Sequence, residues 1–230
     1  MLKSFLHSSV GKKIIMAITG LGMIGFLIGH LAGNLTLLTG NADKFNRYSH
    51  FLTSLGALLI AVELGLLLLL LLHMYEGICV AIGKLKARPE GYEEVGNAGG
   101  PSRKTLSSRT MIYSGIVILV FVFIHVRSFK YGPGIPEGYV SMAGGAEIRD
   151  LHRLVVERFS HPGYVAFYVA CMILLGLHLR HAFWSAFQSL GVHHPRYTPI
   201  LYGIGTALAA VLSIGFLIIP LWVFFSGGSP

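Results

Sequence analysis

Four histidines stand out because each lies inside a different long apolar stretch of the sequence: His30, His73, His125 and His178. A polar ring at membrane depth needs a partner, so an intramembrane histidine indicates a functional site. A hydrogen bond to a neighbouring helix would explain any one of them, but four rings on four stretches favour a shared role. Neutral imidazole is a good axial ligand of haem iron, and two imidazoles leave no open position on the metal. Such a centre suits the transfer of electrons.

Five apolar stretches are long enough to cross a membrane. A hydrocarbon core of about 30 Å requires roughly 20 helical residues, and the candidate spans cover residues 14–38, 52–82, 108–130, 162–190 and 199–225. The four histidines occupy the first four spans, one in each. We therefore predict an all-α membrane protein with five transmembrane helices, four of which form a haem-binding bundle, in one domain over residues 1–230.

The composition excludes several other classes of protein. Apolar residues make up 53% of the chain, charged residues only 12%, and the mean hydropathy is +0.67. Soluble domains carry roughly a quarter charged residues, so a soluble enzyme, a disordered chain and a nucleic-acid binder are all excluded. The two cysteines lie in apolar stretches without a CxxC or CxxCH motif, which excludes a disulfide scaffold, a zinc ribbon and covalently attached haem.

The basic residues predict the orientation of the chain in a membrane. With the N-terminus inside, the inner segments hold eleven lysines and arginines and the outer segments hold seven. The net charge of +8 therefore indicates topology and no nucleic-acid partner. We expect the N-terminus inside and the C-terminus outside.

The depths of the histidines sort them into two levels. At about 1.5 Å per residue, His30 lies roughly 24 Å and His125 roughly 21 Å from the inner starts of their spans. His73 lies about 13 Å and His178 about 18 Å from the inner ends of theirs. This count favours an outer pair, His30 with His125, and an inner pair, His73 with His178, as axial ligands of two stacked b-type haems. His181, on nearly the same helix face as His178, is the alternative ligand in span four.

Glycines recur every four residues on span one, at Gly25, Gly29 and Gly33. Small residues at this spacing let a second helix or a flat macrocycle approach the backbone closely. Either occupant explains the spacing. Arg127 and Arg180, each two residues after a candidate ligand, are candidates to bind haem propionates, although each is also explained as a residue that sets topology.

A carboxyl group inside span two, Glu63, is a candidate for exchanging protons with a quinone. Reaction with a quinol needs an electron acceptor and a proton acceptor beside a hydrophobic slot. Tyr48 and His50, near the outer level, are further candidates for the protic part. A structural role, at the membrane interface or between helices, explains each of the three equally well.

The longest connection between spans follows span three. Its later part, residues 146–159, alternates charged residues with apolar residues at helical spacing. We predict an amphipathic helix on the membrane surface, with a plain solvated loop as the alternative.

Several segments resemble the single-chain dihaem cytochrome b subunit of succinate:quinone oxidoreductases, the five-span anchor of succinate dehydrogenases and fumarate reductases. The likeness covers nearly the whole chain and is carried by SSVGKKIIMAITGL, GFLIGHLAGNL, YSHFLTSLG, LLHMYEGI, FIHVRSFKYG and FYVACMILLGLHLRHAFWSAFQSLGVHHPRYTP. The axial ligands of that family correspond to the four histidines, paired as above. The chain departs from the family pattern at Asn46 and near Gly176, where some members carry acidic residues.

The resemblance implies a role in the respiratory chain and the tricarboxylic acid cycle. The chain would anchor a flavoprotein subunit and an iron–sulfur subunit on the inner face of a bacterial cytoplasmic membrane, docking them through residues 84–109 and the N-terminal segment. It would pass electrons through two haems b to a quinone, with menaquinone as the expected one. Succinate–fumarate chemistry would occur on the flavoprotein, so this chain would hold no catalytic residue for it.

Two other classes of protein are compatible with the residues. The dihaem cytochrome b subunit of a hydrogenase or formate dehydrogenase would share the haems and the quinone but would have different protein partners. A non-redox membrane anchor or transporter would use the histidines for hydrogen bonds between helices. A haem spectrum and the co-purifying polypeptides distinguish these alternatives.

Overall fold

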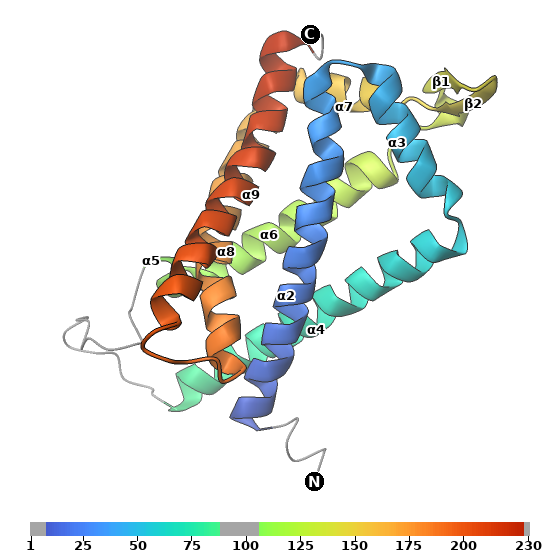
Figure 1. The fold of residues 1–230 in the computed structure, drawn as a ribbon. Coiled ribbons are helices and arrows are strands. Elements are labelled where there is room, and N and C mark those ends of the chain that lie inside the picture. The colour runs from blue at the N-terminus through green and yellow to red at the C-terminus, as the bar shows by residue number, and fades with distance from the viewer. Residues whose placement is uncertain (1–7, 88–105, 228–230) are drawn as a thin grey trace.

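A computed structural model describes residues 8–87 and 106–227 of the chain (Figure 1). The described part contains five helical segments that are long and apolar enough to cross a membrane: α2 (Ser9–Asn34), α4 (Ala57–Ala87), α6 (Met111–His125) continued by the π-helical turn η2 (Val126–Lys130), α8 (Pro162–Ser189) and α9 (Thr198–Ser226). This confirms the predicted helical membrane protein with five spans.

Shorter elements connect the five long helices. They are η1 (Leu35–Thr39), α3 (Ala42–Ser54), α5 (Leu106–Arg109), the π-helical turn η2 (Val126–Lys130), η3 (Ile135–Glu137), β1 (Val140–Ala143), β2 (Ala146–Arg149) and α7 (Leu151–Phe159). Figure 1 shows α3, α7 and both strands at the end of the bundle where α9 finishes, which we call the C-terminal end. The opposite end, where α2 begins, is called the N-terminal end.

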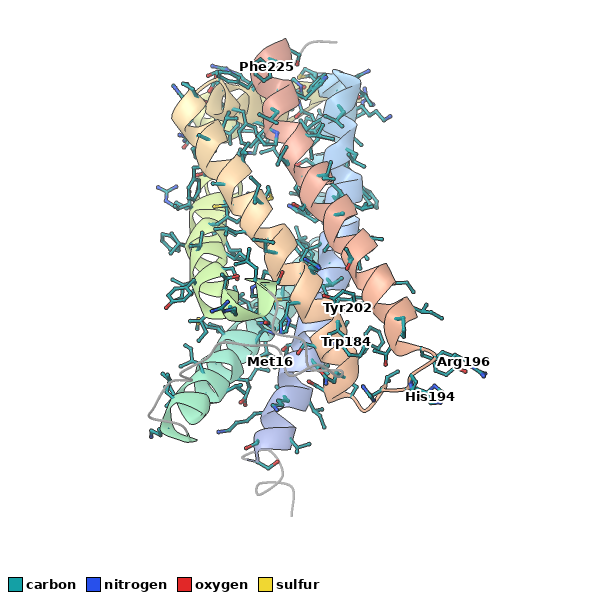
Figure 2. All side chains as sticks on the ribbon, turned by 90° about the vertical axis from the view of Figure 1, so that its left-hand side faces the viewer. Met16, Trp184, His194, Arg196, Tyr202 and Phe225 are labelled. Carbon is teal, nitrogen blue, oxygen red and sulfur yellow. The ribbon has the colours of Figure 1, made fainter. Side chains whose placement is uncertain are left out.

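The long helices form a bundle in which α8 holds a central place. Helix α8 packs against α2, α6 and α9, and α2 packs against α4 as well. Figure 1 shows α4 and α6 crossing the bundle obliquely, whereas α2, α8 and α9 run more nearly along it. Figure 2 shows Phe225 at the C-terminal end and Trp184 and Tyr202, on α8 and α9, toward the N-terminal end.

Helix α9 lies so close to α8 that glycine is required at the contact. A Cβ atom on Gly176 would lie 2.7 Å from Oγ of Ser213, and one on Gly205 would lie 2.7 Å from Cδ1 of Phe183. The Ser213 hydroxyl also donates a hydrogen bond to the carbonyl oxygen of Met172 at 2.7 Å. Gly176 is therefore a packing position between two helices.

The second span begins later than predicted. Helix α3 ends at Ser54, and Gly56 has a φ angle of +54°, in the left-handed region that favours glycine. The chain turns at this glycine, so α4 begins at Ala57 and not at residue 52. The polar residues before the turn form α3, a separate helix that the sequence analysis did not anticipate.

The predicted amphipathic helix over residues 146–159 is only partly correct. The first four residues form β2, which pairs antiparallel with β1, and the helix α7 begins at Leu151. Gly144 and Gly145 have φ angles of +60° and +84°, the conformation of a two-residue hairpin turn. The side chain of Asp150 then caps α7, because it accepts a hydrogen bond from a backbone N–H of the first turn.

Candidate functional site

His30 of α2 and His125 of α6 face each other in the half of the bundle toward the C-terminal end. Their ring centroids are 5.7 Å apart and their planes are inclined at 86°. Nδ1 of His125 lies 3.1 Å from the hydroxyl of Tyr168 on α8. Beside His30, the side-chain amide of Asn34 lies 3.4 Å from Nε2 and donates to the His30 carbonyl oxygen at 2.8 Å. The fold thus brings together the two histidines predicted to form the outer pair.

Aromatic side chains surround His125. The ring centroids of Phe121 and Phe129 lie 5.6 Å and 5.3 Å from the imidazole centroid. Tyr168 is buried, and its hydroxyl lies 3.2 Å from that of Tyr164, which is one turn nearer the beginning of α8. These rings exclude water from the imidazole, and the two tyrosine hydroxyls continue its polar contact toward the C-terminal end of the bundle.

His73 of α4 and His178 of α8 both lie toward the N-terminal end of the bundle, where they contact α2 and α6. Nδ1 of His73 lies 3.2 Å from the carbonyl oxygen of Met16 and 3.3 Å from Oγ1 of Thr19, both on α2. Figure 2 shows Met16 on this part of α2. Nδ1 of His178 lies 3.0 Å from Oγ of Ser114 on α6. Each inner histidine therefore binds, through Nδ1, the helix that precedes its own among the five spans.

The side chain of His178 is directed at α6. A Cβ atom on Gly115 of α6 would lie 3.6 Å from Cε1 of His178. The hydroxyl of Ser114, the residue before this glycine, contacts the same ring. This geometry supports His178 as the member of the pair in the fourth span.

The glycines of the first span have different environments. A side chain on Gly33 would overlap the phenol of Tyr48, so this glycine is required for the packing of α3 on α2. A Cβ atom on Gly25 or Gly29 would meet no other atom of the described chain within 4 Å. The close approach of a second helix therefore accounts for Gly33 but not for the two glycines beside His30.

The two arginines proposed as propionate partners also differ. Arg127 is exposed and donates a hydrogen bond to the carbonyl oxygen of Tyr131 at 2.8 Å. Arg180 has a buried Nε that makes no hydrogen bond within the described residues, and its guanidinium carbon lies 5.9 Å from the ring centroid of Tyr202. Of these two arginines, Arg180 is the one whose side chain has a buried donor without a partner among the described residues.

The three residues proposed for quinone and proton chemistry have separate environments. Tyr48 packs against α2, and His50 is exposed on α3. The Glu63 carboxylate forms an ion pair with Lys130, at the end of η2. The side chain of Glu63 is 34% exposed and that of Lys130 is 41% exposed, so the acid is half-buried and paired. The sequence predicted an acid within the span but did not predict Lys130 as its partner.

The polar residues that hold the inner histidines were missed by the sequence analysis. Thr19 and Ser114 are buried, with exposed fractions of 3% and 2%. A signal exists, because each precedes a glycine and lies eleven positions before a histidine, at 19 and 30 and at 114 and 125. A serine or threonine inside an apolar span commonly donates a hydrogen bond to a backbone carbonyl of its own helix, so its presence alone does not indicate a functional site.

The fold and the site define a multi-pass helical membrane protein that carries one of these four histidines on each of four spans, with the rings of His30 and His125 in contact. No protein-family model matches the chain, and neither a curated protein nor a solved structure shows significant similarity to it.

Proposed function

We propose that this chain is a dihaem cytochrome b that anchors a succinate:quinone oxidoreductase and passes electrons between its iron–sulfur subunit and a membrane quinone. The observation that supports the proposal is the placement of four histidines on four membrane-spanning helices, with His30 in contact with His125 toward one end and with His73 and His178 both toward the other. Hydrogen bonding between helices alone does not require two pairs at two levels.

The geometry of the outer pair fits a shared metal. Two imidazoles that each bind one metal ion at about 2 Å have ring centroids on the order of 6 Å apart, and the centroids of His30 and His125 are 5.7 Å apart. Gly25 and Gly29 leave the face of α2 beside His30 without side chains, which suits the close approach of a flat macrocycle.

The chain's own residues would hold and insulate the two centres. A haem bound by two histidines supplies a one-electron carrier without an open coordination position. The contacts to Nδ1 of His73, His125 and His178 leave Nε2 of each ring for a metal. The buried Nε of Arg180 suits a carboxylate of the inner haem, and Arg127 remains the second candidate for a propionate.

The quinone and the protein partners rest on the resemblance. We place the flavoprotein and iron–sulfur subunits on the inner face of a bacterial cytoplasmic membrane, with the N-terminus of this chain inside and its C-terminus outside. Of the predicted docking segment, residues 88–105 lie outside the described residues, as do residues 1–7 of the N-terminal segment. The quinone, menaquinone by the resemblance, would react near Glu63, Tyr48 and His50.

The proposal is tested by purifying the full chain and recording its absorption spectrum. We expect the bands of low-spin b-type haem and two haems per chain. His73→Ala and His178→Ala should each remove the same haem, whereas His30→Ala and His125→Ala should each remove the other. His181→Ala, one turn along α8, is the matched control and should retain both haems.

The result also separates the alternative classes of protein. A colourless wild-type protein overturns the proposal in favour of an anchor or transporter with structural histidines. A coloured protein that co-purifies with a flavin-bearing and an iron–sulfur polypeptide belongs with the succinate-type complexes. Co-purification with a hydrogenase or formate dehydrogenase subunit would overturn the assignment of partners but not the two haems.

A further inference from the structure

We propose that Thr19 and Ser114 are the positioning residues of the inner histidine pair, and that their hydroxyl oxygens lower the reduction potential of the inner haem. The inference rests on the proposed function, because it assumes that His73 and His178 bind a haem. It concerns hydroxyl groups to which neither the residue pattern nor the resemblance assigned a role.

Each of the two hydroxyls donates its one proton to a carbonyl oxygen of its own helix. A hydroxyl has one proton to donate and can accept further hydrogen bonds through its lone pairs. Thr19 donates to the carbonyl oxygen of Ile15 at 2.8 Å, and Ser114 donates to that of Met111 at 3.1 Å. The oxygen of each hydroxyl is then left to accept a hydrogen bond from a histidine.

The histidines supply the complementary donors. The carbonyl oxygen of Met16, 3.2 Å from Nδ1 of His73, can only accept, so this nitrogen carries the proton. The same proton lets His73 donate to Thr19 at 3.3 Å. A metal on Nε2 of His178 would leave the proton of that ring on Nδ1, which would then donate to Ser114 at 3.0 Å. With the proton on Nδ1, the lone pair of Nε2 is available to a metal.

The same arrangement, a hydroxyl residue followed by a glycine beneath a histidine ring, occurs twice in the fold. Thr19 is followed by Gly20 and Ser114 by Gly115. A Cβ atom on Gly20 would lie 3.2 Å from Cε1 of His73, and one on Gly115 would lie 3.6 Å from the corresponding atom of His178. In each helix the hydroxyl therefore contacts the imidazole nitrogen and the ring lies over the adjacent glycine; at Gly20 the contact is tight, whereas at Gly115 it is an ordinary van der Waals distance.

The spacing along the helices relates the inner level to the outer one. Eleven residues, the separation of Thr19 from His30 and of Ser114 from His125, correspond to about three helical turns and return to the same face. Helices α2 and α6 thus each supply an outer histidine and, three turns away, the hydroxyl that holds an inner histidine. The pairs α2–α4 and α6–α8 are two equivalent halves of the site.

An acceptor on Nδ1 makes the imidazole a more basic ligand. A more basic ligand favours ferric over ferrous haem, so removal of the acceptor raises the reduction potential of that haem. The effect should be larger for Ser114 than for Thr19, because His73 keeps the carbonyl oxygen of Met16 as an acceptor. For His178, the contact with Ser114 is the Nδ1 hydrogen bond found among the described residues.

The experiment is a redox titration of both haems in the purified full chain, with Ser114→Ala and Thr19→Val. The inner haem is identified as the one that His73→Ala removes. For Ser114→Ala we expect its ferric–ferrous equilibrium to shift about tenfold toward the ferrous form, which equals about 59 mV for a one-electron couple. Thr19→Val should give a smaller shift in the same direction, and the outer haem should keep its potential.

Three control variants separate positioning from general damage. Ser114→Thr and Thr19→Ser keep the hydroxyl and should restore the wild-type potential. Thr206→Val removes a hydroxyl that donates to the Tyr202 carbonyl oxygen within α9, at 2.9 Å, and should move neither potential. If Ser114→Ala loses the inner haem alone and Ser114→Thr restores it, the positioning role is supported. If both haems are lost, the Thr19→Val titration decides.

The failures of the two proposals are distinguishable. A wild-type chain without haem overturns the proposed function and removes the premise. A wild-type chain with two low-spin haems, whose inner potential is unchanged in Ser114→Ala and Thr19→Val, overturns this inference alone. Equal shifts of both haems would also contradict it, because they would indicate a change spread through the bundle.

Discussion

The side-chain amide of Asn46 on α3 donates a hydrogen bond to the carboxylate of Asp150 at 2.8 Å, and this contact joins α3 to the beginning of α7. The amide oxygen of Asn46 accepts a second bond from the backbone N–H of His152 at 2.9 Å. Asn46 is 1% exposed. The residue that stands where some relatives of the proposed family carry an acid is therefore a structural bridge between two short helices.

Asn46→Ala should destabilise the C-terminal end of the bundle. The substitution leaves a part-buried carboxylate oxygen and a part-buried N–H with fewer partners, at a cost of about 1 kcal/mol. Hydrogen exchange of residues 140–159 should accelerate. Asn41→Ala is the control, because Asn41 caps α3 at an exposed position and should leave exchange in residues 140–159 unchanged. Equal protection in Asn46→Ala and wild type would contradict the bridging role.

The ion pair of Glu63 with Lys130 connects α4 to the end of η2, the turn that continues α6, and should show energetic coupling. Both side chains are partly exposed, so we expect a coupling energy on the order of 0.2–1 kcal/mol. Unfolding of Glu63→Gln, Lys130→Met and the double variant in detergent measures it. The double variant should be less destabilised than the sum of the single changes. Strict additivity would show that the two charges do not stabilise one another.

Gly33→Ala should destabilise the packing of α3 on α2. The added methyl group would overlap the phenol of Tyr48, and overpacking of this kind costs about 1–3 kcal/mol. A lower unfolding temperature is expected. Gly203→Ala on α9 is the matched control, since its Cβ would meet no atom within 4 Å; it should be neutral or stabilising. Loss of stability in both variants would assign the effect to helix backbone and not to Tyr48.

The C-terminal end of the bundle should loosen as the pH falls below neutrality. Burial lowers the pKa of His152 from its ordinary value of 6.5, partly opposed by the charge of Asp150, so the unfolded form takes up a proton more readily. Stability is then fully present above pH 6.5 and decreases as the pH falls toward the lowered pKa. Hydrogen exchange of α7 at pH 7 and pH 5.5, corrected for intrinsic rates, measures this.

His152→Phe is the variant that isolates the histidine. It retains an aromatic ring beside Phe45, whose centroid lies 6.4 Å away, and should remove the change between pH 7 and pH 5.5. A second loss should remain as the pH falls below 4.5, the ordinary pKa of a glutamate, because the hydroxyl of Tyr139, and then Arg153, lower the pKa of Glu157. A carboxylate of this kind stabilises the fold above its unfolded pKa and loses that effect as the pH falls. An unchanged profile in His152→Phe would exclude His152 as its source.

Hydrophobic length alone determined the five spans. Because a bilayer offers no hydrogen-bond partner to the backbone, an apolar stretch of about 20 residues has to be a helix. Histidines at two depths follow from the same count, since the rise per residue is constant. The spans and the pairing of His30 with His125 therefore needed no knowledge of how the helices pack.

Only the tertiary structure decided what each polar side chain touches. Lys130 and Glu63 are far apart in the sequence, as are Ser114 and His178, and their contacts depend on the tilt and rotation of whole helices. Those angles are set by packing against neighbours, which hydropathy does not encode. Likewise, the positive φ angle of Gly56 starts the second long helix later than its hydropathy suggested. The positive φ angles in the β1–β2 turn place a strand where composition suggested the beginning of a helix.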